Sequence, residues 1–200
     1  MNFPLKAIRY RTFIDPLLAG LRNEVLLKIN SRDRVLEIAC GTGMLAMAMA
    51  SKASHVTATD LSEENIAAAS QSAGKNGIEN LDFGVLDASD LSCYSGREFD
   101  AAVISMAIHQ FDQELAVKIL LELKNIASRI IIADYSHHMP RGWGRKLATA
   151  IEWLAGGNHY RNFRNYMAAG GIPYFAAKAG IKPVSRSVRG RGIFLVTVCN

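Results

Sequence analysis

The chain has 200 residues and a formal net charge of +5, with 50% of its residues apolar and 20% charged. This length predicts a single domain that buries roughly 70% of its unfolded surface, and this composition excludes an intrinsically disordered chain. The longest apolar run, at 44–50, is far shorter than the ~20 residues that cross a bilayer. We therefore expect neither a membrane-spanning segment nor a membrane partner.

The compartment is predicted from the amino terminus and the cysteines. The first residues, MNFPLKAIRYRTF, have neither the apolar centre of about 7–15 residues nor the small-residue cleavage site of a signal peptide. Cys40, Cys93 and Cys199 are odd in number and form no CxxC pair, which argues against a disulfide framework and against a zinc site. We expect a cytoplasmic chain with reduced cysteines and no metal.

Charge is distributed unevenly along the chain. Residues 1–140 hold 13 Lys and Arg against 17 Asp and Glu, whereas residues 141–200 hold 10 against 1. The two portions can neutralise each other within one fold, or the basic portion can form a binding surface. The sequence alone leaves both interpretations open.

Segments rich in β-branched residues alternate with segments of helical periodicity, which predicts a doubly wound α/β fold. The expected parallel strands are RVLEIA at 34–39, HVTATD at 55–60, LDFGVLD at 81–87, FDAAVISM at 99–106 and RIIIADY at 129–135. Two further strands, at 182–189 and 193–199, flank a glycine turn and are expected to form an antiparallel hairpin. The prediction is a mostly parallel, seven-stranded sheet that ends in this hairpin.

Two segments lie outside this alternation. Residues 1–30 are expected to form a helical cap, because 5–29 have the apolar spacing of one or two amphipathic helices. Residues 136–171 are aromatic, basic and rich in glycine, and they are too long for an ordinary connection of about 2–6 residues. We interpret them as a lid or acceptor-binding segment within the single domain 1–200.

The most informative segment is VLEIACGTGMLA at 35–46, a predicted strand that leads into a glycine turn and then a helix. Gly41 and Gly43 allow a tight turn and a close approach of a ligand, and the helix N-terminus offers unpaired N–H groups. Asp60 ends the next strand, where a carboxylate can accept both hydroxyls of a ribose, and Asp87 ends the third strand. The pattern predicts a nucleotide-type cofactor, and the glycine loop by itself is also compatible with a dinucleotide.

The segments VLEIACGTG, TATDLS, LDAS and FDAAVISMAIHQF resemble the motifs of class I S-adenosylmethionine-dependent methyltransferases, particularly the small quinone-biosynthesis-like enzymes. The resemblance runs from about Arg34 to Tyr135 and returns in the terminal hairpin. It implies a Rossmann-like methyltransferase fold with S-adenosyl-L-methionine as the cofactor. The cofactor-binding residues that it implies are Glu37, Gly41, Thr42, Gly43, Asp60, Leu61, Asp87, Ala88, Ser105 and Met106.

The resemblance also implies a role for each part of this site. The glycine loop holds the methionine part of the cofactor, and Glu37 orients its amino group. Asp60 takes the ribose hydroxyls, Asp87 approaches the adenine, and Ser105 and Met106 flank the sulfonium. This chain therefore presents a side chain for each part of the cofactor.

One position departs from the commonest form of the motif, because Ala39 stands where most relatives have glycine. We expect the extra methyl group to be tolerated on the strand side. The terminal antiparallel hairpin fits the methyltransferases and not the dinucleotide-binding fold. No Lys-Ser/Thr pair follows the glycines, which excludes a phosphate-binding P-loop.

The loop at 105–111 contains neither the Asn/Asp-Pro-Pro-Tyr/Phe motif of adenine amino-methyltransferases nor the Pro-Cys of cytosine-C5 enzymes. Imidazole accepts a proton near neutral pH, and a tyrosine hydroxyl can orient the acceptor. The candidate catalytic residues are His109, His137, His138, His159 and Tyr160. The structural alternative for His109 is packing of its loop, and for His137 and His138 it is a surface turn.

The expected function is methyl transfer to an oxygen, carbon or sulfur atom of a small molecule. An anionic or aromatic acceptor is favoured, because 156–166 mixes aromatic and amide groups with arginine. Two alternatives stay open. One is an RNA-modifying methyltransferase that uses the basic carboxyl-terminal portion, and the other is a cofactor-binding protein without catalysis. Nucleic acid is the less expected partner.

Overall fold

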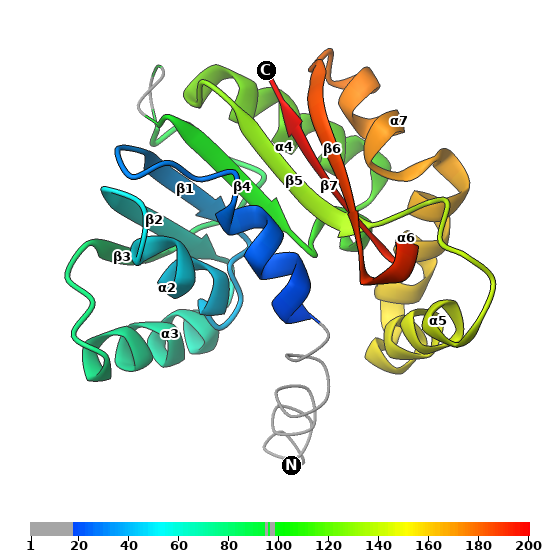
Figure 1. Ribbon diagram of the computed structural model, residues 1–200, viewed down its shortest axis with the longest axis horizontal. Helices are drawn as coiled ribbons and strands as arrows, with labels where there is room; N and C mark the ends of the chain where they lie inside the picture. Colours follow the sequence, from blue (N-terminus) through cyan, green and yellow to red (C-terminus); the bar gives the residue numbers. More distant parts are fainter. Residues whose placement is uncertain (1–17, 95, 97–98) are drawn as a thin grey trace.

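The computed structural model describes residues 18–94, 96 and 99–200. Within this part of the chain a seven-stranded sheet has the order β3-β2-β1-β4-β5-β7-β6 (Figure 1). Neighbouring strands from β3 to β5 are parallel, whereas β7 is antiparallel to both β5 and β6. The predicted fold class is confirmed, including the terminal antiparallel hairpin.

Each predicted strand overlaps an observed one. The apolar runs of β1, β4 and β5 are buried between two layers of helices, whereas the polar edge strand β6 is exposed. The strands are β1 (Arg34–Ile38), β2 (His55–Asp60), β3 (Leu81–Val85), β4 (Ala101–Ser105), β5 (Ile130–Tyr135), β6 (Pro183–Arg189) and β7 (Phe194–Cys199). The labelled helices are α2 (Met44–Ala50), α3 (Glu63–Lys75), α4 (Gln113–Ile126), α5 (Trp143–Ala155), α6 (Gly157–Ala169) and α7 (Gly171–Lys178). Two short 3-10 helices are η1 (Ile108–Gln110) and η2 (Gly190–Gly192).

Helix starts follow the capping residues in the sequence. The Ser62 side chain accepts a hydrogen bond from the Asn65 N–H at the start of α3, and Glu63 and Glu64 occupy the first turn. Asp112 caps α4 in the same way through the Leu115 N–H. These carboxylates and hydroxyls satisfy N–H groups that have no partner inside the helix, so they fix where each helix begins.

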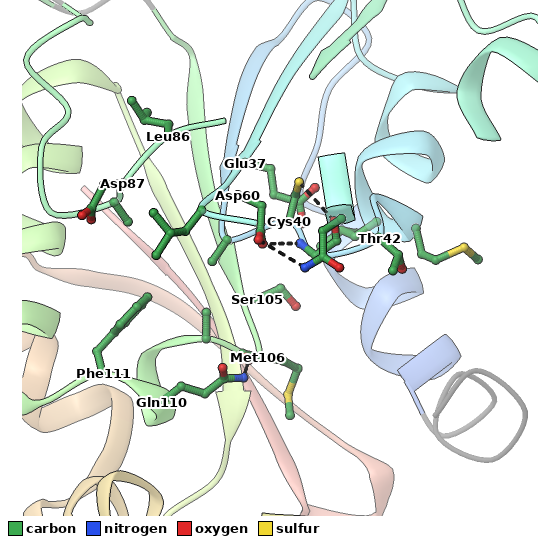
Figure 2. A pocket seen from close by; sticks show the side chains of 18 of the residues that line it. Glu37, Cys40, Thr42, Asp60, Leu86, Asp87, Ser105, Met106, Gln110 and Phe111 are labelled. Carbon is green, nitrogen blue, oxygen red and sulfur yellow. Dashed lines mark hydrogen bonds between the residues drawn. The ribbon is translucent and has the colours of Figure 1, made fainter. Parts of the chain in front are cut away.

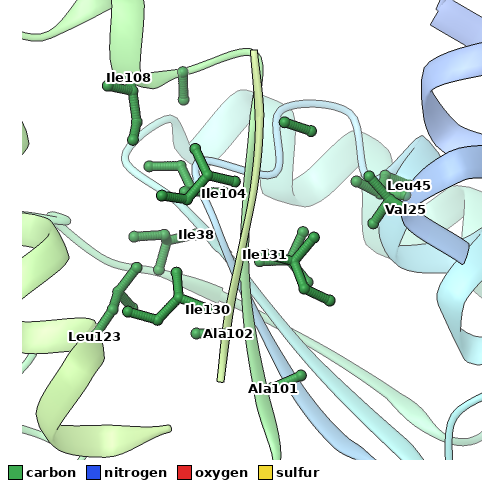
Figure 3. Close-up of a cluster of buried hydrophobic side chains, with 14 of the residues drawn as sticks. Val25, Ile38, Leu45, Ala101, Ala102, Ile104, Ile108, Leu123, Ile130 and Ile131 are labelled. Carbon is green, nitrogen blue, oxygen red and sulfur yellow. The ribbon is translucent and has the colours of Figure 1, made fainter. Parts of the chain in front are cut away.

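The core lies on both faces of the sheet (Figure 3). Successive residues of β5 point to opposite faces, and Ile130 and Ile131 are both buried. Leu123 of α4 packs on one face, whereas Leu45 of α2 and Val25 lie on the other. The two helical layers hold the strand ends at a fixed position, and these ends form the site described below.

The two segments outside the alternation are largely helical where the structure describes them. Residues 18–26 of the expected cap form a helix, 27–30 do not, and 1–17 lie outside the described residues. The segment 136–171 forms α5 and α6, which follow each other with only Gly156 between them. A lid motion of this segment stays a prediction. Among the described residues no helix has the length and apolarity needed to cross a membrane.

The backbone after β1 turns through a residue with an unusual conformation. Ala39 has φ +54°, in the left-handed region that a Cβ disfavours by roughly 1–2 kcal/mol. Gly43, at the start of α2, also has a positive φ, and a Cβ there would lie 2.7 Å from the Phe83 ring. The methyl group of Ala39 is expected to be tolerated, and the positive φ adds that it strains the backbone.

Replacing Ala39 with glycine should stabilise the protein. Glycine adopts φ +54° without a steric penalty, and this gain exceeds the extra freedom that glycine has in the unfolded chain. We expect Ala39→Gly to raise the free energy of unfolding by about 1 kcal/mol in urea titrations. The matched control is Ala68→Gly on the exposed side of α3, which should lower it by about 1 kcal/mol. A loss of stability in Ala39→Gly would contradict the assignment of strain.

Candidate functional site

A cavity of about 400 Å³ opens at the carboxyl ends of β1, β2 and β4 (Figure 2). Its volume lies within the range of roughly 300–1,000 Å³ that ligand pockets occupy. Nine of the ten cofactor-binding residues predicted from the sequence line it: Glu37, Gly41, Thr42, Asp60, Leu61, Asp87, Ala88, Ser105 and Met106. The tenth, Gly43, is the N-cap of α2 directly beyond the loop.

The Asp60 carboxylate holds the glycine loop in place. One carboxylate oxygen accepts a hydrogen bond from the Gly41 N–H at 2.7 Å, and the other accepts from the Ser62 N–H at 3.0 Å and the Asn65 side chain at 3.2 Å (Figure 2). A carboxylate has about four acceptor positions, so Asp60 retains capacity for a ligand hydroxyl. A Cβ on Gly41 would meet no atom within 4 Å, which leaves space for a ligand against the backbone.

Glu37 is the most unusual polar side chain of the cavity. Only 2% of its surface is exposed, and its Oε2 has no hydrogen-bond partner among the described residues. Burial, together with the nearby negative charge of Asp60, raises the pKa of Glu37 to about 8. A buried carboxyl without a partner is costly, and a cationic ligand group at this position would restore its ionised form.

Asp87 lies at the open edge of the cavity. Its Oδ1 accepts a hydrogen bond from the Ser89 N–H at 2.8 Å, and the hydrogen bonds of Ser89 hold the pKa of Asp87 below its usual value. Leu86 and Phe111 provide apolar lining in the same cavity (Figure 2). This edge therefore combines apolar surface with one carboxylate, an arrangement that suits a planar ring with exocyclic N–H groups.

The segment after β4 forms another wall of the cavity. Met106 has φ +54°, and its N–H donates to the Ala133 carbonyl at 2.7 Å. The Gln110 side chain donates to the Met106 carbonyl at 2.8 Å, which closes the loop around η1. Ser105, Met106 and Gln110 thereby all reach the cavity.

His109 is in the same loop but points away from the cavity. It is 1% exposed, and its Nδ1 lies 2.6 Å from Asp134 Oδ1, while its Nε2 lies 3.4 Å from Glu152 Oε1. Burial alone lowers the pKa of His109, but the charges and hydrogen bonds of Asp134 and Glu152 outweigh it and raise the pKa to about 9. His109 is thus a buried imidazolium at neutral pH, which fits the packing alternative and does not allow it to accept a proton.

The other four candidate catalytic residues do not line the cavity either. His137 and His138 follow β5, and their ring centroids are 3.8 Å apart. His137 is half-buried and has a Nδ1 without a hydrogen-bond partner among the described residues, whereas His138 is exposed. His159 is exposed on α6, and Tyr160 lines a separate groove beside α5. The catalytic assignments stay predictions.

Several lining residues were not predicted from the sequence. Asn65 reaches the cavity from the first turn of α3, and Gln110 and Phe111 reach it from the loop after β4. The position of Gln110 and Phe111 directly after a strand could have indicated them. Leu18 and Arg22 come from the helix at 18–26, whose place beside the cavity no local pattern indicates.

In the described part of the chain no group of His, Cys, Asp and Glu side chains could hold a metal ion.

A family model described as a methyltransferase domain matches residues 35–129. A ubiquinone biosynthesis O-methyltransferase of Dinoroseobacter shibae is 26% identical over 158 residues, which are 76% of this chain and 61% of that protein. A 23S rRNA (uracil(1939)-C(5))-methyltransferase of Methylococcus capsulatus is 37% identical over 75 residues, which are 36% of this chain and 17% of that protein. A SAM-dependent methyltransferase structure from Aquifex aeolicus covers 99% of this chain and 98% of that chain, with a TM-score of 0.69 and 17% identity.

The structural likeness shows a shared fold, and the family match covers the strands and loops that form the cavity. These matches support the resemblance of the chain to the class I S-adenosylmethionine-dependent methyltransferases. It spans about three fifths of the length of the ubiquinone relative and a smaller part of the rRNA relative.

His109, Asp134 and Glu152 form a buried cluster, the His109 cluster, which makes a pH-dependent contribution to stability. The pKa of His109 is about 9 in the folded state, whereas an unfolded histidine titrates near about 6.5. The contribution is thus fully present below about pH 6.5 and is lost as the pH rises through about 9. His109→Gln should lower the free energy of unfolding by about 3–5 kcal/mol near pH 6, because Asp134 and Glu152 lose their counter-charge.

Urea titrations across about pH 6–9 measure this effect. The free energy of unfolding of the wild type should fall as the pH rises, and His109→Gln should show little of this fall. The matched control is His55→Gln, which removes an exposed histidine paired with Asp82. It should leave the pH dependence in place, because exposed ion pairs contribute about 0–1 kcal/mol. An equal decline in His109→Gln and in the wild type would show that His109 is not the titrating group.

Proposed function

We propose that this chain transfers a methyl group from S-adenosyl-L-methionine to a small-molecule acceptor. The observation that carries the proposal is the buried carboxyl of Glu37, whose Oε2 has no hydrogen-bond partner among the described residues and which lines the cavity with the glycine loop. An amino group bound there gains a charged hydrogen bond and satisfies Glu37 Oε2. Asp60 faces the same cavity, with acceptor capacity left for a ribose hydroxyl.

The charges of the cavity also favour this cofactor over a dinucleotide. Three of its lining residues, Glu37, Asp60 and Asp87, are acidic, and one, Arg22, is basic. A pyrophosphate near the glycine loop would lie beside the Asp60 carboxylate and be repelled, whereas a sulfonium and an ammonium are attracted. The acidic lining thus supports a cationic ligand.

S-adenosyl-L-methionine supplies a methyl group on a positively charged sulfur, so the chain has to position a nucleophile in line with it. Met106 and Gln110 line the cavity next to Ser105, and they are proposed to face the acceptor. An oxygen or carbon nucleophile also needs a proton acceptor. Burial first, then the charges of His138 and Arg186, lower the pKa of His137, so it stays a predicted proton acceptor although it does not line the cavity.

The small-molecule class of the acceptor is supported by the relative named for ubiquinone biosynthesis. The cavity after β4 is lined by apolar and amide groups, which suit an aromatic acceptor. The likeness to the rRNA enzyme covers 17% of that protein, so it gives weaker support for an RNA substrate. The cytoplasm is the proposed compartment, and the free thiols of Cys40, Cys93 and Cys199 fit it.

Asp60→Ala should weaken the binding of S-adenosyl-L-methionine and its demethylated product. The variant removes a charged acceptor for the ribose and the anchor of Gly41, and the expected loss is about 1.5–3 kcal/mol, or about 10- to 150-fold in Kd. Calorimetric titration measures it, and NAD should not bind to the wild type. The control is Asp82→Ala, which removes an exposed carboxylate outside the cavity and should leave Kd unchanged. Unchanged affinity in folded Asp60→Ala would remove the ribose assignment.

The acceptor class is tested by incubating the protein with cofactor labelled in the methyl group and a metabolite extract. We expect label in a small molecule, and a fraction extractable into organic solvent would fit the aromatic class. The Asp60→Ala variant serves as the control for background transfer. Label in RNA from a parallel reaction, with none in small molecules, would replace the proposal with the RNA-modifying alternative. Absence of label from both the small molecules and the RNA would favour a binding protein without catalysis.

A further inference from the structure

Helix α5 presents an apolar stripe to solvent. Trp143 is 87% exposed, Leu147 47% and Leu154 67%. With Ala150, which is also exposed, these residues follow each other at intervals of three and four positions and so lie on one face of the helix. Exposed large side chains scattered singly need no explanation, but a contiguous stripe marks an interaction surface.

The direction of the stripe is fixed by the opposite face of α5. Gly144 packs so closely on Ile193 that a Cβ would lie 2.4 Å from its Cδ1. Ala148 is buried one turn later, and Glu152 is buried another turn later against His109 and Tyr135. These three residues anchor α5 to the domain, so the stripe does not rotate inward.

The surface beside the stripe is positively charged. Arg141, Arg145 and Lys146 line an open groove of about 670 Å³ together with Trp153 and Tyr160. Among the described residues these three cations form no salt bridge. The one acidic residue between 141 and 170 is Glu152, which is buried. The α5 surface therefore combines an apolar stripe, two exposed tryptophans and uncompensated positive charge.

We propose that α5 docks this chain on an anionic membrane surface. An apolar helix face with tryptophan, bordered by Lys and Arg, is the pattern of helices that lie in the interface of a bilayer. Leucine and tryptophan enter the boundary between headgroups and acyl chains, and the cations contact anionic headgroups. The 13 residues of α5 span about 20 Å, less than the ~30 Å of the hydrocarbon core, so the helix lies along the surface.

Charge complementarity favours an anionic membrane over two other partners of the α5 surface. A second copy of the chain would bring Arg141, Arg145 and Lys146 against the same three cations, and like charges oppose such a contact. RNA phosphates would pair with the cations and RNA bases would stack on the tryptophans, but RNA gives exposed Leu147 and Leu154 no apolar partner.

The inference goes beyond the proposed methyl transfer and does not rest on it. The expectation of no membrane partner came from the absence of a spanning segment, which a helix lying on the surface does not need.

The two tryptophans of the chain, Trp143 and Trp153, both lie on α5, so tryptophan fluorescence, excited selectively over tyrosine, reports on this surface alone. The full chain is titrated with vesicles of phosphatidylcholine, or of phosphatidylcholine with phosphatidylglycerol. We expect the emission to shift to shorter wavelength with the anionic vesicles only, and the protein to sediment with them. High salt should reverse both signals, because it screens the attraction. Trp153→Phe isolates Trp143, which should retain the shift.

The apolar contribution is tested with Leu147→Ser/Leu154→Ser. We expect this double variant to lose at least tenfold in vesicle affinity, because each leucine loses the burial of its side chain. The matched control is Leu27→Ser/Leu121→Ser, which removes two leucines exposed by 68% and 43% elsewhere on the molecule. It should bind vesicles as the wild type does. Circular dichroism and cofactor titration check that each variant is folded.

The electrostatic contribution is tested with Arg141→Gln/Arg145→Gln/Lys146→Gln. Each cation near an anionic surface contributes about 1 kcal/mol, so the triple variant should lose roughly 100-fold in affinity. The control, Arg32→Gln/Lys75→Gln/Lys182→Gln, changes the net charge equally at exposed positions outside α5 and should lose far less.

Three results would overturn the proposal. One is an unchanged emission of the folded wild type with anionic vesicles at low salt. Another is an equal loss of affinity in the α5 variants and their matched controls. The third is a spectral shift that depends on protein concentration without vesicles, or that RNA produces and vesicles do not. These readouts do not use methyl transfer, so failure of the proposed activity and failure of membrane docking are distinguishable.

Discussion

The hydrogen bond from the Gly41 N–H to the Asp60 carboxylate is the interaction on which the site depends. It joins the turn after β1 to the end of β2, and the same carboxylate also accepts from Ser62 and Asn65 at the start of α3. One side chain therefore sets the position of the glycine loop, the second strand and the third helix. A parallel sheet places these strand ends at one edge, and Asp60 fixes their distances there.

Charge separates the molecule into two functional surfaces. The acidic residues of the cavity suit a cationic cofactor, whereas the exposed side of α5 is basic. The imbalance between residues 1–140 and 141–200 was visible in the sequence, with a neutralising fold and a basic surface both open. For α5 the structure favours a basic surface, because Glu152 is buried and Arg141, Arg145 and Lys146 form no salt bridge within the described part. Acidic side chains of the described residues therefore do not pair with these cations.

Most of the fold and the cofactor side of the site could be predicted, because both depend on local pattern. Strand periodicity and the glycine turn lie within a few neighbouring residues, and the order of parallel strands brings Glu37, Asp60 and Ser105 together. The place of His109 could not be predicted, since its partners Asp134 and Glu152 are 25 and 43 positions further along the chain. The strain at Ala39 was also missed, because φ depends on how the loop closes on Asp60 rather than on side-chain size.

The His109 cluster gives α5 a connection to the cavity. Asp134 binds both the ring and the backbone N–H of His109, so it orients η1 and with it the neighbouring Gln110. Glu152 approaches the same imidazolium from the inner face of α5, one residue before Trp153 on the outer side. Breaking a buried ion pair is costly, so the contact of Glu152 with His109 stabilises the observed position of α5 relative to η1. A surface that binds to Trp143 and its neighbours is therefore linked through Glu152, His109 and Asp134 to the loop that carries Met106 and Gln110.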